Sequence, residues 1–337
     1  LVDHNGTTQP AWIRLNNVTE LRLLFAASVM ISHAATLLNP EGYRLLRTFL
    51  NSEAAVQGFF ILSGYLVCGS YDRLRNARHF YVRRFMRIYP AYFVAVILFI
   101  ALGIVQAMML GNAVRWADAP LYLISNLATL NFLKPNVEGV FADNPLTIVN
   151  GALWSIKVEA MFYVILPLLY HFASRYSFLL LTLVMITAGA IWWPAITSIA
   201  GAYGQTIPVS FKLQLPGQLH YFGLGIALFA RSKGLISTVT LALIVTFAIA
   251  ILLALDSWRE ARQVVALVLV IGTVSILPQV KDMLRGQDIS YGIYLCHFPL
   301  IQLLIAGGFR GLPLLLYLIA IVLLSVGYGL LSWRLIE

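Results

Sequence analysis

Residues 89–110 read YPAYFVAVILFIALGIVQAMML, which is 22 residues without one charged side chain. A helix needs about 20 mainly apolar residues to cross the hydrocarbon core of a bilayer. The segment directly before this stretch, residues 72–88, holds six arginines and one aspartate. Loops rich in Lys and Arg stay on the cytoplasmic side of a membrane. The two stretches together predict a membrane-spanning helix that starts at the cytoplasmic face.

The composition of the whole chain has the same character. Of its 337 residues, 60% are hydrophobic and 11% are charged. Soluble domains carry about 25% charged residues, and disordered chains combine low hydrophobicity with high charge. Both classes are therefore excluded. The composition predicts an all-α polytopic membrane helix bundle, with residues 1–337 as a single membrane domain.

Ten stretches of the chain, counting the one above, are candidates for membrane spans. They are residues 20–38, 54–71, 89–110, 152–171, 178–194, 216–231, 237–255, 262–280, 289–306 and 312–334. Gly and Pro inside some of them are tolerated where neighbouring helices cover the backbone. Residues 111–151 are too apolar for a linker and too interrupted for a span. We predict that they form a structured extracytoplasmic loop with short interfacial helices.

The distribution of charge sets the orientation. With residues 72–88 in the cytoplasm and ten spans, both termini are cytoplasmic, and residues 1–18 form a polar cytoplasmic segment. This leaves 14 basic and 6 acidic residues inside, against 9 basic and 8 acidic residues outside. Nearly all of the net charge of +9 is then on one side, as expected for a membrane protein. The charge therefore gives no reason to expect a nucleic-acid partner. Cys68 and Cys296 lie in apolar runs and form no CxxC pair, so we expect no disulfide framework and no metal site.

His33 is an ionisable residue inside the first predicted span, where such residues are costly and often functional. Arg22 precedes it by eleven residues. At about 100° per residue, eleven residues exceed three full turns by about 20°, so both side chains share a helix face about 16 Å apart. Arg22 is expected at the cytoplasmic edge and His33 in the outer half. The alternative is an arginine that snorkels to the surface and a hydrogen-bonded core histidine.

Arg84 and Arg87 are neighbours on one helix face at the entry to the third span, because they are three residues apart. Guanidinium groups bind phosphate through paired hydrogen bonds. The two side chains are therefore candidates for binding an anionic substrate. The alternative is a topology signal that contacts lipid headgroups.

A carboxylate lies in the fourth predicted span, in the sequence WSIKVE of residues 154–159. This span runs inward from the outside, which puts Glu159 about 9–10 Å below its start, near the depth of His33. An unpaired buried carboxylate is expensive, so Glu159 is a candidate partner of the histidine. The alternative is a structural ion pair with Lys157 or an arginine.

Two further motifs favour a packing role. Ser63 and Gly64 in the second span allow neighbouring helices to approach closely, and no base is adjacent to the serine in sequence. His297 lies seven residues after Ser290, on the same face of the ninth span. We favour a hydrogen-bonded packing histidine there and a packing motif at Ser63.

The motifs together resemble the acyltransferase-3 family of integral membrane acyltransferases. The resemblance covers nearly the whole chain and rests on five motifs in order. They are Arg22 followed by His33, FFILSGYL at 59–66, RFMRIYP at 84–90, WS followed by Glu159 at 154–159, and SYGIYLCH at 290–297.

The resemblance implies transfer of an acyl group, with acetyl as the first choice, from acyl-CoA to a carbohydrate. It implies that His33 is catalytic, that Glu159 is an essential acidic residue, and that Arg22, Arg84 and Arg87 serve the acyl-CoA. The motifs supply further candidate linings of the site: Ser63, Trp154, Ser155, Ser290, Tyr291 and His297. It also implies a bacterial cytoplasmic (inner) membrane location, acetyl-CoA as donor substrate, and no metal.

Acyl transfer needs a base for the acceptor hydroxyl and stabilisation of the developing oxyanion. His33 is the candidate base, because histidine titrates near neutrality, and Glu159 would orient and charge-balance it. The acceptor would enter from the outer side, where residues 111–151 could cover the site. Direct transfer and an acyl-His intermediate both stay open. The acceptor also stays open: a cell-wall glycan, a lipopolysaccharide sugar, another carbohydrate or glycolipid, or a small natural product.

A transporter is the alternative function. His33 and Glu159 would then form an intramembrane proton relay. The absence of a visible inverted repeat weakens this hypothesis.

Overall fold

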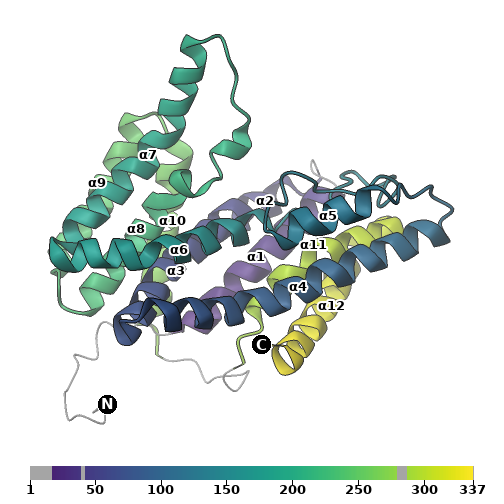
Figure 1. Cartoon of the computed structure of the whole chain (residues 1–337), viewed down its shortest axis with the longest axis horizontal. Helices are drawn as coiled ribbons and strands as arrows, with labels where there is room; N and C mark the ends of the chain where they lie inside the picture. The colour runs from purple at the N-terminus through teal and green to yellow at the C-terminus, as the bar shows by residue number, and fades with distance from the viewer. Residues whose placement is uncertain (1–16, 39–41, 279–286, 337) are drawn as a thin grey trace. The chain divides into compact units, whose positions relative to one another are not determined.

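The computed structural model describes residues 17–38, 42–278 and 287–336, and Figure 1 labels its helices. Within these ranges the chain forms helices and turns and no strand. Ten of the described helices are long: α1 (Val18–Leu38), α3 (Ser52–Leu74), α4 (Ala77–Met109), α6 (Trp154–Arg175), α7 (Phe178–Ala202), α8 (Leu215–Ser232), α9 (Thr238–Ala254), α10 (Trp258–Ile276), α11 (Ser290–Ala306) and α12 (Leu314–Leu335). The short elements are α2 (Arg44–Phe49), α5 (Asp118–Leu127), η2 (Val209–Phe211) and η3 (Phe309–Gly311).

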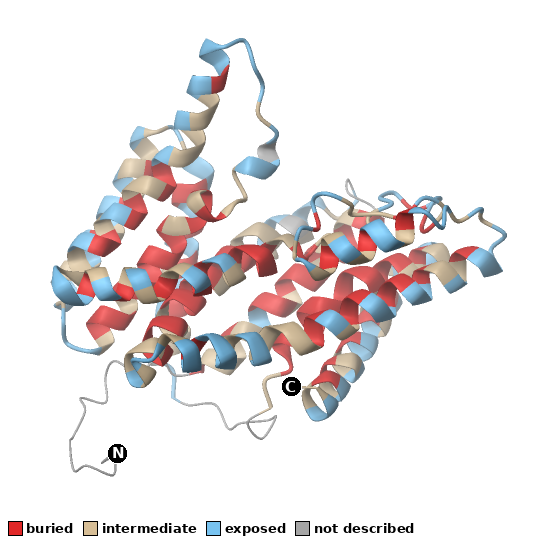
Figure 2. Ribbon diagram, viewed as in Figure 1, coloured by how far each residue is buried: buried red, intermediate tan, exposed pale blue. Residues whose placement is uncertain are grey.

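Each of the ten predicted spans corresponds to one long helix of the described chain, so the all-α polytopic bundle is confirmed. Six of the described helices are both long and apolar enough to cross a membrane. Their outer faces expose large hydrophobic side chains, as Leu315, Leu323 and Leu331 do on α12. Figure 2 shows such exposed residues along α4 and α12. Large uncovered apolar faces mark contact with a membrane or a partner, and here lipid is the expected cover. Of the predicted polar segment, residues 1–16 lie outside the described residues.

Most of the arginine-rich segment is helical, whereas we predicted a loop between the second and third spans; only Arg75 and Asn76 lie between α3 and α4. α4 begins at Ala77 and has 33 residues, which makes it about 50 Å long, while a hydrocarbon core is about 30 Å thick. Arginine is a good helix former, so the helix continues beyond its apolar part. Arg84 and Arg87 are consequently held on a rigid helix rather than on a loop.

The fifth span is also longer than predicted. Its apolar run indicated residues 178–194, but α7 continues through Pro194 to Ala202. Proline removes one backbone donor and usually ends a helix. Within a membrane bundle it is tolerated, because neighbouring groups satisfy the freed carbonyl.

The described chain divides into two compact units. Unit 1 comprises residues 17–21, 57–77 and 162–278. Unit 2 comprises residues 22–38, 42–56, 78–161 and 287–336. The boundary falls inside α1, α3 and α6 and just after the first residue of α4, so each of these helices contributes residues to both units.

In unit 1, α3 and α8 approach through glycines. A Cβ on Gly64 would collide with the carbonyl oxygen of Phe222, and a Cβ on Gly225 would collide with the backbone of α3. The Phe222 ring stacks on Phe162 with centroids 3.9 Å apart. Ser63 is buried beside this crossing. The contact is the close helix packing that we favoured for Ser63 and Gly64.

In unit 2, residues 111–151 contain α5 and hydrogen-bonded turns. The Tyr92 hydroxyl of α4 donates to the carbonyl oxygen of Asn126 at 2.5 Å, which ties α5 to α4. The Gln302 amide of α11 donates to the carbonyls of Leu146 and Ile148, each at 2.7 Å. These bonds hold the end of the segment along α11.

The sides of the membrane can be tested by labelling single cysteines. In a variant with Cys68 and Cys296 replaced by alanine, a cysteine at exposed Asp143 should react with an impermeant thiol reagent in intact cells. A cysteine at exposed Arg78 should react only after the cells are opened, because its segment is predicted to be cytoplasmic. Labelling at Arg78 in intact cells would show the orientation to be wrong.

Candidate active site

Two histidines meet where α1 and α11 pack together in unit 2. Nδ1 of His33 lies 2.9 Å from Nε2 of His297, which is hydrogen-bond distance. The rings stack with centroids 5.2 Å apart and an interplanar angle of 11°. Phe298 packs edge-on against His33, with ring centroids 5.3 Å apart. His297 is fully buried and His33 is partly buried.

The hydrogen bonds of His297 assign a role to each ring nitrogen. Its Nδ1 lies 3.3 Å from the carbonyl oxygen of Ile293, which can only accept. In a neutral ring, Nδ1 therefore carries the hydrogen and Nε2 is the acceptor. Nδ1 of His33 then donates to His297, and Nε2 of His33 keeps its lone pair. Among the described residues, no side chain bonds to that Nε2, so His33 presents a free basic nitrogen.

Polar groups around the start of α6 border this pair. The Tyr294 ring lies 5.6 Å from the His297 ring. The hydroxyl of Tyr294 is 2.7 Å from Ser155 Oγ and 3.1 Å from the carbonyl oxygen of Ala152. The Asn150 amide donates to a backbone carbonyl of α11 at 2.9 Å. Residues 150–155 are thereby fixed against α11 beside the histidines.

Asp288, just before α11, pairs with arginines from two other helices. Arg22 of α1 forms an ion pair with its Oδ2, and Arg87 Nη2 of α4 lies 3.0 Å from the same oxygen. The Ser290 hydroxyl donates to Oδ1 at 2.5 Å. Burial alone would raise the pKa of Asp288, but Arg22, the Ser290 hydroxyl and Arg87 lower it below its ordinary value. The ionised carboxylate thus holds two guanidinium groups in one place.

The histidine pair and the arginine cluster lie along the same two helices. Arg22 and His33 are eleven residues apart, and Asp288 and His297 are nine apart, or about 16 Å and 13 Å along a helix. Because Arg22 pairs with Asp288 and His33 with His297, α1 and α11 run parallel. Arg87 also pairs with Asp288, so the N-terminal part of α4 lies at the same end as the starts of α1 and α11. This agrees with the predicted directions, in which all three spans start in the cytoplasm.

A small polar cavity of about 120 Å³ lies at the opposite end of unit 2, where α4 and α11 end. Its lining includes amides, a carboxylate and an arginine: Gln106, Asn112, Asp143, Asn144 and Arg310. The Oε1 atom of Gln106 is buried and has no hydrogen-bond partner in the described part of the chain. The cavity therefore presents amide, carboxylate and guanidinium groups together, all of which form directed hydrogen bonds.

A family profile described as "Acyltransferase domain" matches residues 17–333, nearly the whole chain. The chain belongs to the acyltransferase-3 family. Two curated relatives align with more than nine tenths of this chain, and a third aligns with part of it. Nodulation protein 10 of Rhizobium leguminosarum bv. viciae is 28% identical, over 96% of this chain and 92% of its own. The O-acetyl transferase of Shigella phage Sf6 is 24% identical, over 94% of this chain and 93% of its own. Acyltransferase MdmB of Streptomyces mycarofaciens is 26% identical, over 60% of this chain and 47% of its own. No solved structure matches the chain.

The structure of this acyltransferase places the remaining predicted residues as follows. Arg84 is half-buried, with its guanidinium 5.7 Å from the centre of the Phe80 ring. Trp154 is the first residue of α6. Tyr291 donates its hydroxyl to the backbone carbonyl of Ile88 at 3.0 Å, which ties α11 to α4. These three residues belong to unit 2, whereas Ser63 belongs to unit 1.

Glu159 is half-buried on α6, also in unit 2. We expected Glu159 to orient His33. In the structure, the side chain that lies at hydrogen-bond distance from Nδ1 of His33 is His297. We favoured a hydrogen-bonded packing histidine at position 297, and the structure shows that its Nε2 lies at hydrogen-bond distance from the candidate base.

Asp288 is the residue that the sequence motifs missed. A single acidic residue two positions before Ser290, at a predicted cytoplasmic helix end, was a usable signal. Arginines predicted at the same face need a counter-charge, and Asp288 was one of the few carboxylates there.

Proposed function

We propose that this protein is a membrane O-acyltransferase that moves an acyl group, most simply acetyl, from cytoplasmic acyl-CoA to a carbohydrate hydroxyl at the outer side of the membrane. The observation that carries the proposal is the free Nε2 of His33. The bond from Nδ1 of the same ring to His297 orients it, and both histidines lie on the two helices that also hold Arg22 and Asp288. The proposed location is a bacterial cytoplasmic membrane, in line with the positive-inside charge distribution.

The arginine cluster suits the phosphates of CoA. A guanidinium group has five N–H donors, so Arg22 and Arg87 can keep their bonds to Asp288 and still donate to phosphate oxygens. Arg84 lies one helical turn from Arg87 on the same face. In this proposal the pantetheine arm extends along α1 and α11, over the distance of about 16 Å from Arg22 to His33.

The chemical step then follows from the nitrogen roles. Nε2 of His33 takes the proton from the acceptor hydroxyl as the oxygen attacks the thioester carbonyl carbon. The C–S bond of the resulting tetrahedral intermediate breaks, and the CoA thiolate leaves with the proton from the imidazolium. His297 accepts the Nδ1–H bond throughout, so it acts as a positioning residue. The nearby Tyr294 and Ser155 hydroxyls are candidate donors to the oxyanion.

The small cavity at the ends of α4 and α11, on the predicted outer side, is the candidate binding site for a carbohydrate acceptor. Amide and carboxylate groups bind sugar hydroxyls through directed hydrogen bonds, and the lining holds Asn112, Asp143 and Asn144. The name of the phage relative, O-acetyl transferase, supports a hydroxyl as the acceptor group and acetyl as the group transferred.

Transfer by the purified protein tests this proposal. The protein in lipid vesicles receives labelled acetyl-CoA on one side and an oligosaccharide mixture on the other. We expect labelled sugar ester only from protein with His33. Absence of ester together with His33-dependent proton movement across the vesicles would favour the transporter instead.

Variants of His297 test its positioning role. His297→Leu removes the acceptor of the Nδ1–H bond, and we expect kcat to fall about 10- to 100-fold, consistent with orientation of a general base. KM for acetyl-CoA should stay within about twofold, because binding rests on the arginines. His297→Gln keeps an acceptor oxygen and should restore most of kcat. Equal losses in both variants, or a change in KM alone, would contradict the role.

A further inference from the structure

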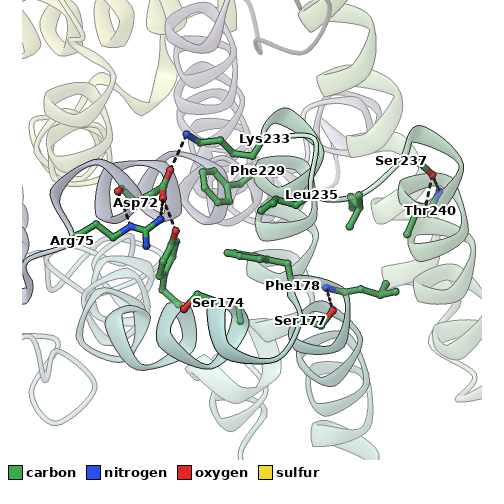
Figure 3. Close-up of a pocket in the computed structure, with 14 residues that line it drawn as sticks. Asp72, Arg75, Ser174, Ser177, Phe178, Phe229, Lys233, Leu235, Ser237 and Thr240 are labelled. Atoms are coloured by element: carbon green, nitrogen blue, oxygen red, sulfur yellow. Dashed lines mark hydrogen bonds and ion pairs between the residues drawn. The ribbon is translucent and has the colours of Figure 1, made fainter. Parts of the chain in front are cut away.

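A second and larger cavity, of about 790 Å³, lies in unit 1 (Figure 3). It forms where α3, α6 and α8 end and where α7 and α9 begin. We call it the Asp72 cavity, and it is lined by Asp72, Arg75, Tyr170, Ala173, Ser174, Ser177, Phe178, Leu179, Phe229, Lys233, Leu235, Ile236, Ser237 and Thr240. None of these residues takes part in the proposed acyl transfer.

The charges in the Asp72 cavity sum to a positive value. The Asp72 carboxylate accepts bonds from the Tyr170 hydroxyl at 2.5 Å, Arg75 at 2.6 Å and Lys233 at 2.8 Å. One negative charge thus faces two positive ones. Both cations keep solvent access, since the Arg75 side chain is 64% exposed and the Lys233 side chain is 40% exposed. Each therefore has N–H donors to offer an incoming anion.

Two helix starts and three helix ends face the cavity. Ser177 caps α7 by accepting bonds from the backbone N–H groups of Leu179 and Leu180. Ser237 caps α9 in the same way, at 3.0 Å from the Thr240 nitrogen. Figure 3 shows both caps at the cavity wall. A helix N-terminus carries about half a positive charge and a C-terminus about half a negative charge. The starts of α7 and α9 are therefore offset by the ends of α3, α6 and α8, and the attraction for an anion rests on Arg75 and Lys233.

The cavity is also amphipathic, and the predicted spans put it at the level of the membrane surface. Five long helices end or begin around it, and helix ends lie at the lipid–water interface. Phe178, Phe229 and Leu235 form an apolar wall beside the charged groups. The predicted orientation puts this end at the cytoplasmic leaflet. Basic pockets between membrane helices on that side are suited to anionic lipid headgroups.

We propose that the Asp72 cavity binds the phosphate group of an anionic phospholipid. Arg75 and Lys233 donate to the phosphate oxygens, while Asp72 and Tyr170 hold the two cations in place. The apolar wall receives the first part of the acyl chains. The site would make this enzyme sensitive to the acidic lipid content of the cytoplasmic leaflet.

Lipid retention by the whole purified protein tests the proposal. Native mass spectrometry would follow phosphatidylglycerol bound to the wild type and to the double variant Arg75→Gln/Lys233→Gln. We expect at least tenfold weaker binding in the variant, as charge-assisted bonds are lost. Arg78→Gln/Arg83→Gln is the matched control, because it removes the same charge from exposed arginines outside the cavity. Equal losses in the two double variants would overturn the proposal.

Further measurements distinguish a phospholipid headgroup from free inorganic phosphate as the ligand. Phosphatidylcholine should bind the wild type more weakly than phosphatidylglycerol, because its choline cation is disfavoured by the net positive charge of the cavity. Inorganic phosphate should displace phosphatidylglycerol only weakly, because it lacks the acyl chains that the apolar wall receives. Leu235→Trp fills the cavity without touching the ion pairs and should also reduce lipid retention, which guards against misfolding of the charge variant. Retention unchanged in folded Leu235→Trp protein would contradict a ligand in the cavity.

Discussion

Replacing His33 with alanine is expected to lower kcat for acyl transfer about 10²- to 10⁴-fold, which is the usual contribution of a general base. The reason is that Nε2 of His33 is the basic nitrogen left free by the bond to His297. The affinity for acetyl-CoA should change less than about twofold, since the arginines supply it. Transfer of labelled acetyl groups and direct binding of acetyl-CoA measure the two effects separately.

His171→Ala is the control for this variant, because His171 is exposed and belongs to unit 1. It should retain wild-type turnover. Combining His33→Ala with Glu159→Gln then tests the expected partnership of these residues. If Glu159 acts through His33, the double variant should be little worse than His33→Ala alone. Near-normal turnover by folded His33→Ala protein would remove His33 from the catalytic role.

Replacing Arg87 with alanine is expected to weaken acyl-CoA binding about 10- to 150-fold, from about 1.5–3 kcal/mol for charge-assisted hydrogen bonds. Arg22→Ala should have a similar effect, because both side chains meet at Asp288. The rise in Kd should be smaller for a CoA analogue that lacks its ribose phosphate if one of the arginines contacts that group. Titration of purified protein with acyl-CoA measures each value.

Two controls separate substrate binding from structural support. Arg83→Ala removes an exposed arginine from the same helix and should leave the Kd unchanged. Asp288→Asn keeps the hydrogen-bond acceptor but frees the arginines from a negative charge, so acyl-CoA should bind at least as tightly as in the wild type. Loss of stability in Arg87→Ala with an unchanged Kd would mean that the arginine serves only the Asp288 cluster.

The ends of helices show the limits of reading apolar runs. The sequence predicted ten spans, and each is a helix in the described chain. The apolar run of α4 starts at Tyr89, directly after the arginines, yet the helix begins about three turns earlier, at Ala77. The length of an apolar run indicates the part of a helix that lipid covers. The helix itself extends beyond that part wherever the neighbouring residues favour helix formation.

The sequence by itself determined the fold class, the family and the candidate chemical groups. Apolar runs and charge bias are local properties, because lipid selects for them span by span. The spacing of Arg22 and His33 likewise put them on one face of one helix. The tertiary structure alone decided their partners: His297 is 264 residues from His33, and Asp288 is 266 from Arg22. Such pairs depend on which helices pack together and in which direction, and helix packing follows from side-chain fit across the bundle rather than from any local period.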